Sequence, residues 1–256
     1  MEDKWLPMPR YKLRKDLVKK ILRGESTQGK SCLELGYGAG DMLLLFAMLG
    51  MNVYGFDFSE QALQLARLRI DNHPALKHNI TLLEKETDIN RKKYDYIMAF
   101  EVLEHIEDDA SRLRKWCNLL NDKGRILLSV PAHQSKWGAN DVACGHFRRY
   151  ERHAMNALLV ESGFQVLEFW NYAYPISMIL DICLHKKTLP KQDNDLSMRQ
   201  RSMQSGIKRQ NSMVNKLLSS DLILTPFFLL QRCFLNRDLS SAYLVLARKN
   251  SDLWRA

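Results

Sequence analysis

The sequence has few of the features that place a chain in a membrane or in an oxidising compartment. Its 256 residues contain no apolar run of the roughly 18–20 residues that a membrane-spanning helix needs. The charged N-terminus lacks the apolar stretch of a secretory signal. The five cysteines are odd in number and none is paired as CxxC, which favours free thiols and argues against a zinc site. We therefore expect a cytoplasmic protein, and no metal site is predicted.

Excess basic charge is scarce over most of the chain and concentrated at its end. Residues 1–180 carry 25 lysines and arginines against 23 aspartates and glutamates, whereas residues 181–256 carry 13 against 6. A uniformly basic domain would indicate nucleic acid, and because this distribution is uneven, a nucleic-acid partner is not expected. The basic end is interpreted as a solvated loop or as a surface for an anionic partner, either a membrane or an acidic protein.

Strand-like and helix-like segments alternate along the chain. Strands are expected at short apolar runs, and helices where apolar residues recur at helical spacing. Because strands joined through helices form parallel sheets covered on both faces, this order predicts an α/β protein. The expected strands are residues 30–35, 52–56, 80–83, 94–100, 125–130, 164–170 and 241–249, and the expected helices are residues 11–23, 41–49, 59–70, 109–121 and 151–162.

A long insertion separates the sixth and seventh expected strands. It contains two apolar stretches, 174–184 and 217–235, and between them a polar, basic run at 186–211 that is predicted to be mobile. We expect the insertion to lie over the substrate cleft as a helical lid. The chain then divides into an N-terminal amphipathic helix (1–24), a core (25–171), a lid (172–240) and a last strand with a tail (241–256).

The stretch LELGYGAG, residues 33–40, places three glycines at alternate positions directly after the first strand. In an open α/β sheet, ligands bind beyond the carboxyl ends of the strands, beside the first strand. Glycines let the backbone turn tightly and approach a ligand. The spacing is GxGxG and not the dinucleotide pattern GxGxxG, because Asp41 occupies the position of the third glycine. Glu34 precedes the loop and would repel a pyrophosphate, so a cationic ligand fits better.

This loop resembles the first motif of the class I S-adenosylmethionine-dependent methyltransferases, E-x-G-x-G-x-G. The resemblance implies a Rossmann-like, seven-stranded, mostly parallel sheet with an antiparallel last strand, and S-adenosylmethionine as the cofactor. It also implies that Asp57 accepts the ribose hydroxyls, that Asp88 lies near the adenine amino group, and that Arg10 or Tyr11 closes over the cofactor carboxylate. The full set of cofactor-binding residues that it implies is Arg10, Glu34, Gly36, Tyr37, Gly38, Gly40, Asp57, Phe58, Asp88, Ile89, Glu101 and Val102.

The segment after the fourth strand narrows the acceptor class. Members of this superfamily that methylate nucleobase amino groups carry an (Asp/Asn)-Pro-Pro-aromatic motif there, whereas this chain has Phe100-Glu101-Val102-Leu103. The resemblance is therefore to the small-molecule branch. His105 is expected to be a packed or capping histidine. The neighbouring acids are expected to form a solvated start of a helix; they are Glu104, Glu107, Asp108 and Asp109.

The loop after the fifth strand, residues 130–155, resembles that of a bacterial subgroup with a GHFRRY-type sequence. It holds two candidate catalytic bases for a hydroxyl acceptor, His146 and His133, of which we favour His146. Arg148, Arg149 and Tyr150 are candidates for acceptor binding. The alternative is that these three residues only hold the loop against the sheet.

These observations predict a methyltransferase that acts on a hydrophobic small molecule, a lipid or a polyketide-like acceptor, preferably at oxygen. Methyl transfer requires alignment of donor and acceptor above all. The basic, apolar lid suits an amphiphilic acceptor delivered from the inner face of a membrane or on an acidic acyl carrier protein. The alternatives are an RNA or protein methyltransferase, and a non-catalytic protein that binds the cofactor on the same fold.

Overall fold

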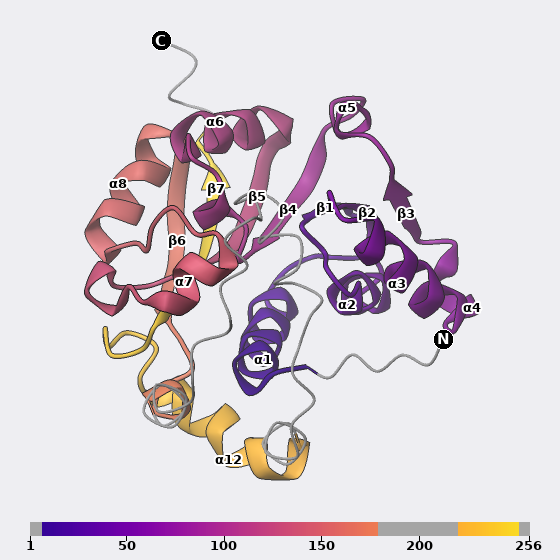
Figure 1. The fold of residues 1–256 in the computed structure, drawn as a ribbon. Helices are drawn as coiled ribbons and strands as arrows, with labels where there is room; N and C mark the ends of the chain where they lie inside the picture. The colour runs from indigo at the N-terminus through magenta and orange to yellow at the C-terminus, as the bar shows by residue number, and fades with distance from the viewer. Residues whose placement is uncertain (1–6, 179–219, 251–256) are drawn as a thin grey trace.

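One seven-stranded sheet runs through the computed structural model, which describes residues 7–178 and 220–250 (Figure 1). The strand order is β3-β2-β1-β4-β5-β7-β6. Strands β1 to β5 pair in parallel, and β7 runs antiparallel to both of its neighbours. The strands are β1 (Ser31–Leu35), β2 (Asn52–Phe56), β3 (Ile80–Leu83), β4 (Tyr94–Phe100), β5 (Leu120–Pro131), β6 (Phe164–Asn171) and β7 (Ala242–Lys249). The predicted fold class is thereby confirmed.

The register brings the carboxyl ends of three strands together. Leu35 of β1 lies beside Phe56 of β2 on one side and beside Ala99 of β4 on the other. The residues that follow these strands therefore meet at one edge of the sheet. They are the glycine loop after β1, Asp57 after β2 and Glu101 after β4.

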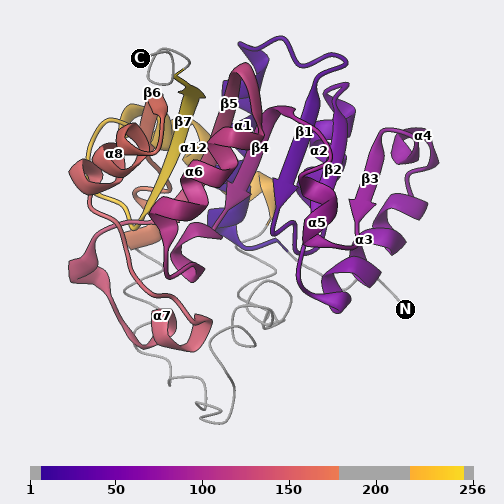
Figure 2. The same cartoon turned by 90° about the horizontal axis from the view of Figure 1, so that it is seen from above.

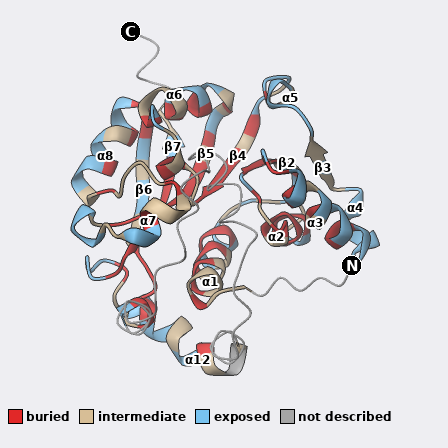
Figure 3. Ribbon diagram, in the orientation of Figure 1, coloured by how far each residue is buried: buried red, intermediate tan, exposed pale blue. Residues whose placement is uncertain are grey.

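Helices cover both faces of the sheet (Figure 2). One buried apolar cluster joins α1, α2 and α12 to the sheet, and a second joins α6 and α8 to its opposite face. Buried residues accordingly concentrate in the central strands and on the helix sides that face them (Figure 3). The longer helices are α1 (Pro9–Arg23), α2 (Asp41–Met48), α3 (Glu60–Asp71), α6 (Asp109–Leu119), α8 (Arg152–Glu161) and α12 (Asp221–Leu230).

Local sequence explains where these helices begin and what they bury. Helix α1 starts with Pro9 in its first turn and buries Leu13, Leu17 and Leu22 at helical spacing. Helix α3 begins after Ser59, whose hydroxyl accepts a hydrogen bond from the Ala62 amide, as its capping role predicts. Within the described residues, no helix has the length and apolar character needed to cross a membrane.

The elements that the sequence did not predict are all short. Four-residue helices α4 (Pro74–Lys77) and α5 (Glu86–Ile89) flank β3, and α7 (Ala139–Cys144) interrupts the loop after β5. Elements of this length are too short to carry a helical period. Strand β5 also begins five residues before the predicted start at 125, with an irregular register opposite Tyr94 and Tyr96. The predicted mobile run 186–211, and most of the apolar stretch 174–184, lie outside the described residues.

Candidate functional site

The glycine loop approaches the end of β4 closely. Gly36 has a φ of +67° and donates its N–H to the Phe56 carbonyl at 2.8 Å. A Cβ added at Gly36 would lie 2.7 Å from Cγ2 of Val102. Glycine is therefore required here both for the backbone conformation and for the close approach. The structure thus places Val102 directly against the loop.

Asp57 is held by the loop that it faces. Its carboxylate accepts N–H bonds from Gly38 and from Ser59, each at 2.9 Å. Burial raises the pKa of this carboxyl, and the two backbone bonds oppose that rise. The adjacent Phe58 is about half exposed and packs edge-on against Phe56. A fixed carboxylate beside an open aromatic ring suits the hydroxyls and the flat base of a nucleoside.

Glu34 is a buried acid among other acids. It is the penultimate residue of β1, is 3% exposed, and its Oε2 has no hydrogen-bond partner within residues 7–178 and 220–250. Burial raises its pKa well above the ordinary value; Arg14 opposes that rise, while Asp41 and Asp57 add to it. A cationic ligand would relieve this arrangement. S-adenosylmethionine carries an ammonium, a sulfonium and a ribose diol, so these residues fit it.

Glu101 directly follows β4 and has a positive φ of +58°. Its carboxylate pairs with Arg10 at 2.9 Å, accepts the Ser129 hydroxyl at 2.8 Å, and lies 3.6 Å from Arg14. Burial by itself would raise the pKa of Glu101. The charges of Arg10 and Arg14 outweigh that effect, so the pKa of Glu101 is lowered. The structure therefore places Arg10 at the same edge of the sheet as the glycine loop, where it pairs with the carboxylate of Glu101.

Three further residues of the implied cofactor set lie as follows. Asp88 is in α5 and pairs with Arg91 at 2.9 Å. Ile89 is buried, and its carbonyl accepts the Tyr94 hydroxyl at 3.1 Å. Tyr37 is 6% exposed and its ring packs in the apolar cluster beneath the loop, against Gly55. The Tyr37 ring is thus part of the core, although the resemblance implies that it binds the cofactor.

His146 is the histidine that the structure orients. Its Nδ1 lies 2.8 Å from Oδ1 of Asp141, which also accepts the Arg149 Nε–H at 2.9 Å. The other ring nitrogen, Nε2, lies 3.9 Å from Oε1 of Glu104. Asp141 is fully buried, and despite that burial its bonds to His146, Arg149 and Gly138 lower its pKa to about 2. A carboxylate that fixes one nitrogen of an imidazole leaves the other to act as a base.

His133, the second candidate, has different neighbours. Its two ring nitrogens each lie 3.4 Å from a carboxylate, of Glu151 and of Asp238, and its ring packs on Tyr243. These contacts join the start of the loop to α8 and to the segment before β7. His133 therefore holds these segments together, and these contacts involve none of the residues that contact His146.

The acidic residues after β4 are only partly a solvated helix start. Glu107 and Asp108 are exposed, and Asp108 caps α6 through the Ser111 amide. The expectation is wrong for Glu104 and Asp109, because both are buried. The cause is the loop after β5, which folds over them: the Phe147 amide donates to the Glu104 carbonyl at 2.8 Å. Burial and the nearby Glu101 raise the pKa of Glu104 well above its ordinary value.

The three residues proposed for acceptor binding make internal contacts. Tyr150 is buried and donates its hydroxyl to Asp109 at 3.0 Å, and Arg148 pairs with the same carboxylate at 2.7 Å. Arg149 holds Asp141 and also donates to the Ala132 carbonyl at 3.3 Å. These contacts favour the alternative in which the three residues hold the loop. Glu104 and Asp141 are the residues that sequence reasoning missed here.

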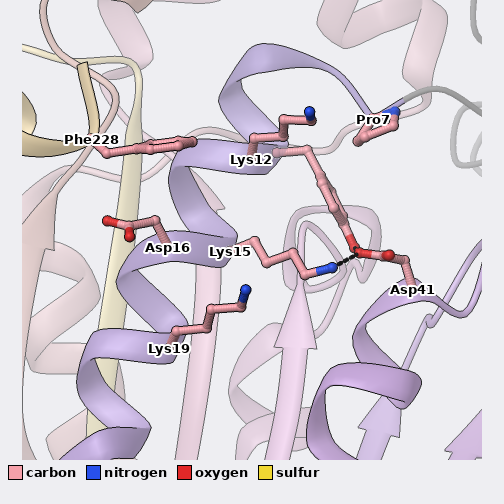
Figure 4. A pocket seen from close by; sticks show the side chains of 8 residues that line it. Pro7, Lys12, Lys15, Asp16, Lys19, Asp41 and Phe228 are labelled. Carbon is pink, nitrogen blue, oxygen red and sulfur yellow. Dashed lines mark hydrogen bonds and ion pairs between the residues drawn. The ribbon is translucent and has the colours of Figure 1, made fainter. Parts of the chain in front are cut away.

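A separate cavity of about 230 Å³ opens between α1 and α12 (Figure 4). In its lining, Lys15 and the Tyr11 hydroxyl both donate to Oδ2 of Asp41, at 2.6 and 2.8 Å. Burial would raise the pKa of Asp41, but Lys15 and Tyr11 lower it. The remaining lining residues are Pro7, Lys12, Asp16, Lys19 and Phe228. Because Asp41 begins α2 directly after Gly40, this cavity lies behind the glycine loop.

Comparison with known proteins gives a family for most of this chain. Residues 9–168 match the family model described as a methyltransferase domain. Curated relatives include the ubiquinone biosynthesis O-methyltransferase of Alkalilimnicola ehrlichii, 30% identical over 46% of this chain and 47% of that protein. The one from Thiobacillus denitrificans is 27% identical over 52% and 59%. The chain spans about half the length of the curated relatives that it matches.

Solved structures show the same fold at low identity. A putative sarcosine dimethylglycine methyltransferase from Galdieria sulphuraria aligns with a TM-score of 0.59 at 14% identity, over 93% of this chain and 86% of that one. Magnesium protoporphyrin IX methyltransferase from Synechocystis, with bound S-adenosylhomocysteine (SAH), aligns with a TM-score of 0.55 at 14% identity. The alignment covers 94% of this chain and 82% of that one. The [4+2]-cyclase SpnF aligns with a TM-score of 0.57 at 12% identity, over 97% of this chain and 85% of that one. Because SpnF is a cyclase, the fold alone does not specify the reaction.

Proposed function

The chain belongs to the methyltransferase-domain family, and from this premise we propose that it methylates an oxygen atom of a small, hydrophobic acceptor. S-adenosylmethionine is the cofactor, and it supplies a methyl group on a positively charged sulfur. The names of the curated relatives, ubiquinone biosynthesis O-methyltransferases, support oxygen as the methylated atom and a small molecule as the acceptor.

The observation that carries the proposal is the acidic, glycine-lined end of β1 and β2. The unpartnered Oε2 of Glu34 offers a site for an ammonium group, and Asp57, fixed by two amide bonds, offers acceptor lone pairs for a ribose diol. Calorimetry with S-adenosylmethionine tests it. Binding to the wild-type chain that is lost in Asp57→Ala supports the assignment. Equal binding by wild type and Asp57→Ala would refute it.

His146 is proposed as the group that removes the acceptor proton. Asp141 holds Nδ1, so Nε2 takes the proton from the acceptor hydroxyl as the oxygen attacks the methyl carbon. The methyl–sulfur bond breaks at the same time, and its electron pair stays on the sulfur. Glu104 lies 3.9 Å from Nε2 and faces the imidazolium that forms.

The acceptor is proposed to reach the site from an anionic lipid surface. On α12, Leu229 and Leu230 are exposed, and α1 presents Lys12 and Lys19 around the neighbouring cavity. Arg232, in the 3-10 turn Gln231–Cys233 directly after α12, pairs with Asp16 of α1 at 3.0 Å. Exposed leucines beside lysines suit the interface of an anionic membrane.

Vesicle sedimentation tests the membrane proposal. Binding to vesicles with anionic lipid, reduced by Leu229→Ser with Leu230→Ser and by high salt, supports it. The matched control is Val160→Ser, an exposed apolar residue on α8. No binding to anionic vesicles, together with a stable complex with an acidic acyl carrier protein, would replace the lipid surface by that protein.

A further inference from the structure

Three potential metal ligands converge beside the cofactor edge of the sheet. They are a carboxylate oxygen of Glu104 and one ring nitrogen each from His105 and His146, all within 4.8 Å of one another. Glu104 and His105 belong to a short 3-10 turn, Leu103–His105, directly after β4. His146 comes from the loop after α7, and its ring packs edge-on against that of His105, with centroids 4.7 Å apart. Two segments that lie 41 residues apart in the sequence thus meet at one point.

Among residues 7–178 and 220–250, Glu104 has no hydrogen-bond partner that explains its burial. Its side chain is completely buried, and both carboxylate oxygens lack a hydrogen-bond partner in the part of the chain that the structure describes. A buried acid without a partner is costly unless a cation or a proton occupies the site. The unpartnered oxygens, one of which lies 3.9 Å from Nε2 of His146, therefore point to a ligand.

The two histidines have the outer contacts that metal-binding histidines need. Nδ1 of His105 lies 3.1 Å from the Gly145 carbonyl, and Nδ1 of His146 lies 2.8 Å from the Asp141 carboxylate. In metal sites, a ligating histidine donates its other ring N–H to such a carbonyl or carboxylate, which fixes the ring and the tautomer. In each ring, Nε2 is then the nitrogen left to bind an ion. Asp141 is itself fixed by Arg149 Nε and by the Gly138 amide, each at 2.9 Å.

We propose that Glu104, His105 and His146 bind a divalent transition-metal ion, with zinc as the reference case. Two imidazoles and one carboxylate form a ligand set that zinc and iron accept, with at least one coordination position left open. Ligands about 2.1 Å from a zinc ion at tetrahedral angles lie roughly 3.4 Å apart. The three ligand atoms lie within 4.8 Å of one another, so they would have to approach by up to about 1.4 Å to reach that spacing. The cysteine spacing, which argued against a zinc site, concerns sulfur ligands only.

This inference rests on the proposed function and deepens it. The open position of the ion would take the acceptor oxygen, and a bound ion lowers the pKa of such a hydroxyl. With an ion bound, Glu104, His105 and His146 would hold it, and it would supply Lewis-acid activation of the acceptor hydroxyl; His146 would then act as a ligand and not as the base. In the metal-free enzyme His146 is the base.

Metal binding itself is the test, and it is independent of turnover. The full chain, without a histidine tag, is stripped with a chelator and titrated with Zn²⁺ by calorimetry, and with Co²⁺ by visible absorption. We expect one equivalent per chain and a cobalt spectrum of low coordination number. Glu104→Gln and His105→Ala are expected to weaken binding at least 100-fold, and Asp141→Asn by about 10–100-fold as an outer contact. His153→Ala, an exposed histidine on α8, is the matched control and leaves binding unchanged.

Two outcomes would overturn the inference. One is the absence of stoichiometric binding to a protein that still binds S-adenosylmethionine, because cofactor binding shows that the chain is folded. The other is metal binding that His153→Ala abolishes and Glu104→Gln does not. If the stripped enzyme methylates its acceptor at the full rate, the ion has no catalytic role and the proposed function stands. If the wild-type protein binds the metal ion but does not bind S-adenosylmethionine, the proposed function is refuted instead.

Discussion

Asp141 lies 2.8 Å from Nδ1 of His146 and turns Nε2 of that ring toward the buried Glu104. The three side chains come from α7, from the loop that follows it and from the turn after β4. Their arrangement depends on the left-handed Gly145, which ends α7 and brings His146 back over Asp141: the His146 amide donates to the Asp141 carbonyl at 2.9 Å. The orientation of the ring is thus fixed by a six-residue segment.

Asp141→Asn tests this orientation. The amide can no longer accept a strong bond from both His146 and Arg149, so the imidazole loses its fixed tautomer. We expect kcat to fall by roughly 10²–10⁴-fold, as for other positioned bases. The dissociation constant for S-adenosylmethionine should stay the same, because Asp141 makes no contact with the glycine loop. Steady-state kinetics and calorimetry measure the two quantities.

The control for Asp141→Asn is Asp122→Asn, an exposed aspartate within β5 that changes the net charge equally. It should leave kcat unchanged. If Asp141→Asn has the kcat of the control, His146 does not depend on Asp141 and the assigned orientation is wrong.

Glu34→Gln separates stability from cofactor binding. Burial raises the folded-state pKa of Glu34, so the folded chain keeps this proton where the unfolded chain, with an ordinary pKa of about 4.3, has lost it. The stability from this group is therefore full below that value and is lost as the pH rises. Glutamine removes the titration, and we expect Glu34→Gln to unfold at a higher urea concentration than wild type at pH 7–8.

The stability gain in Glu34→Gln should disappear near pH 4, while its affinity for S-adenosylmethionine falls at pH 7–8 because the carboxylate for the ammonium is gone. Glu161→Gln, at an exposed position on α8, is the control and should change neither quantity. A variant that is less stable than wild type at pH 8 would contradict the raised pKa. A variant with undiminished affinity would remove Glu34 from the cofactor site.

Gly36→Ala tests the close approach of the loop to β4. The new Cβ would lie 2.7 Å from Cγ2 of Val102. The alanine would also have to keep the φ of +67°, so backbone strain adds to the steric clash. We expect a loss of about 1–3 kcal/mol in the free energy of unfolding, with weaker cofactor binding. Gly29→Ala is a matched control, because its φ is +71° and nothing lies within 4 Å of the added Cβ.

The steric part of the Gly36→Ala effect should be recovered by a second change. Val102→Ala removes Cγ2, so Gly36→Ala with Val102→Ala should lose less stability than the sum of the two single variants. Urea unfolding of the four proteins measures this coupling. Strict additivity would show that backbone strain alone explains the requirement for glycine.

The sequence predicts which residues gather around the glycine loop better than it predicts the contacts of the loop after β5, for a physical reason. Gly36 and Asp57 follow strands directly, so the parallel register of the sheet brings them together. Glu104 and Asp141 depend on how a long loop folds back, through the Phe147 amide and the His105–His146 ring contact. No period or local spacing encodes such a contact, and a run of acids after a strand has the composition of a helix start. The seventh strand was predicted because it alternates, although its partners β5 and β6 lie far away in the sequence.

Tyr150→Phe distinguishes loop anchoring from acceptor binding. The variant loses the hydrogen bond that the buried Tyr150 hydroxyl donates to Asp109. Asp109 still has its ion pair with Arg148, at 2.7 Å. We expect about 1–2 kcal/mol less stability toward urea and an unchanged KM for the acceptor, because the contact only holds the loop. Tyr96→Phe is the control: its hydroxyl donates to Glu25 at 3.2 Å, far from this loop, so a comparable cost in stability is expected, again without a change in KM. A KM that rises tenfold in Tyr150→Phe and not in Tyr96→Phe would return Tyr150 to the acceptor-binding residues, because the loss of a merely structural bond would act on both variants alike.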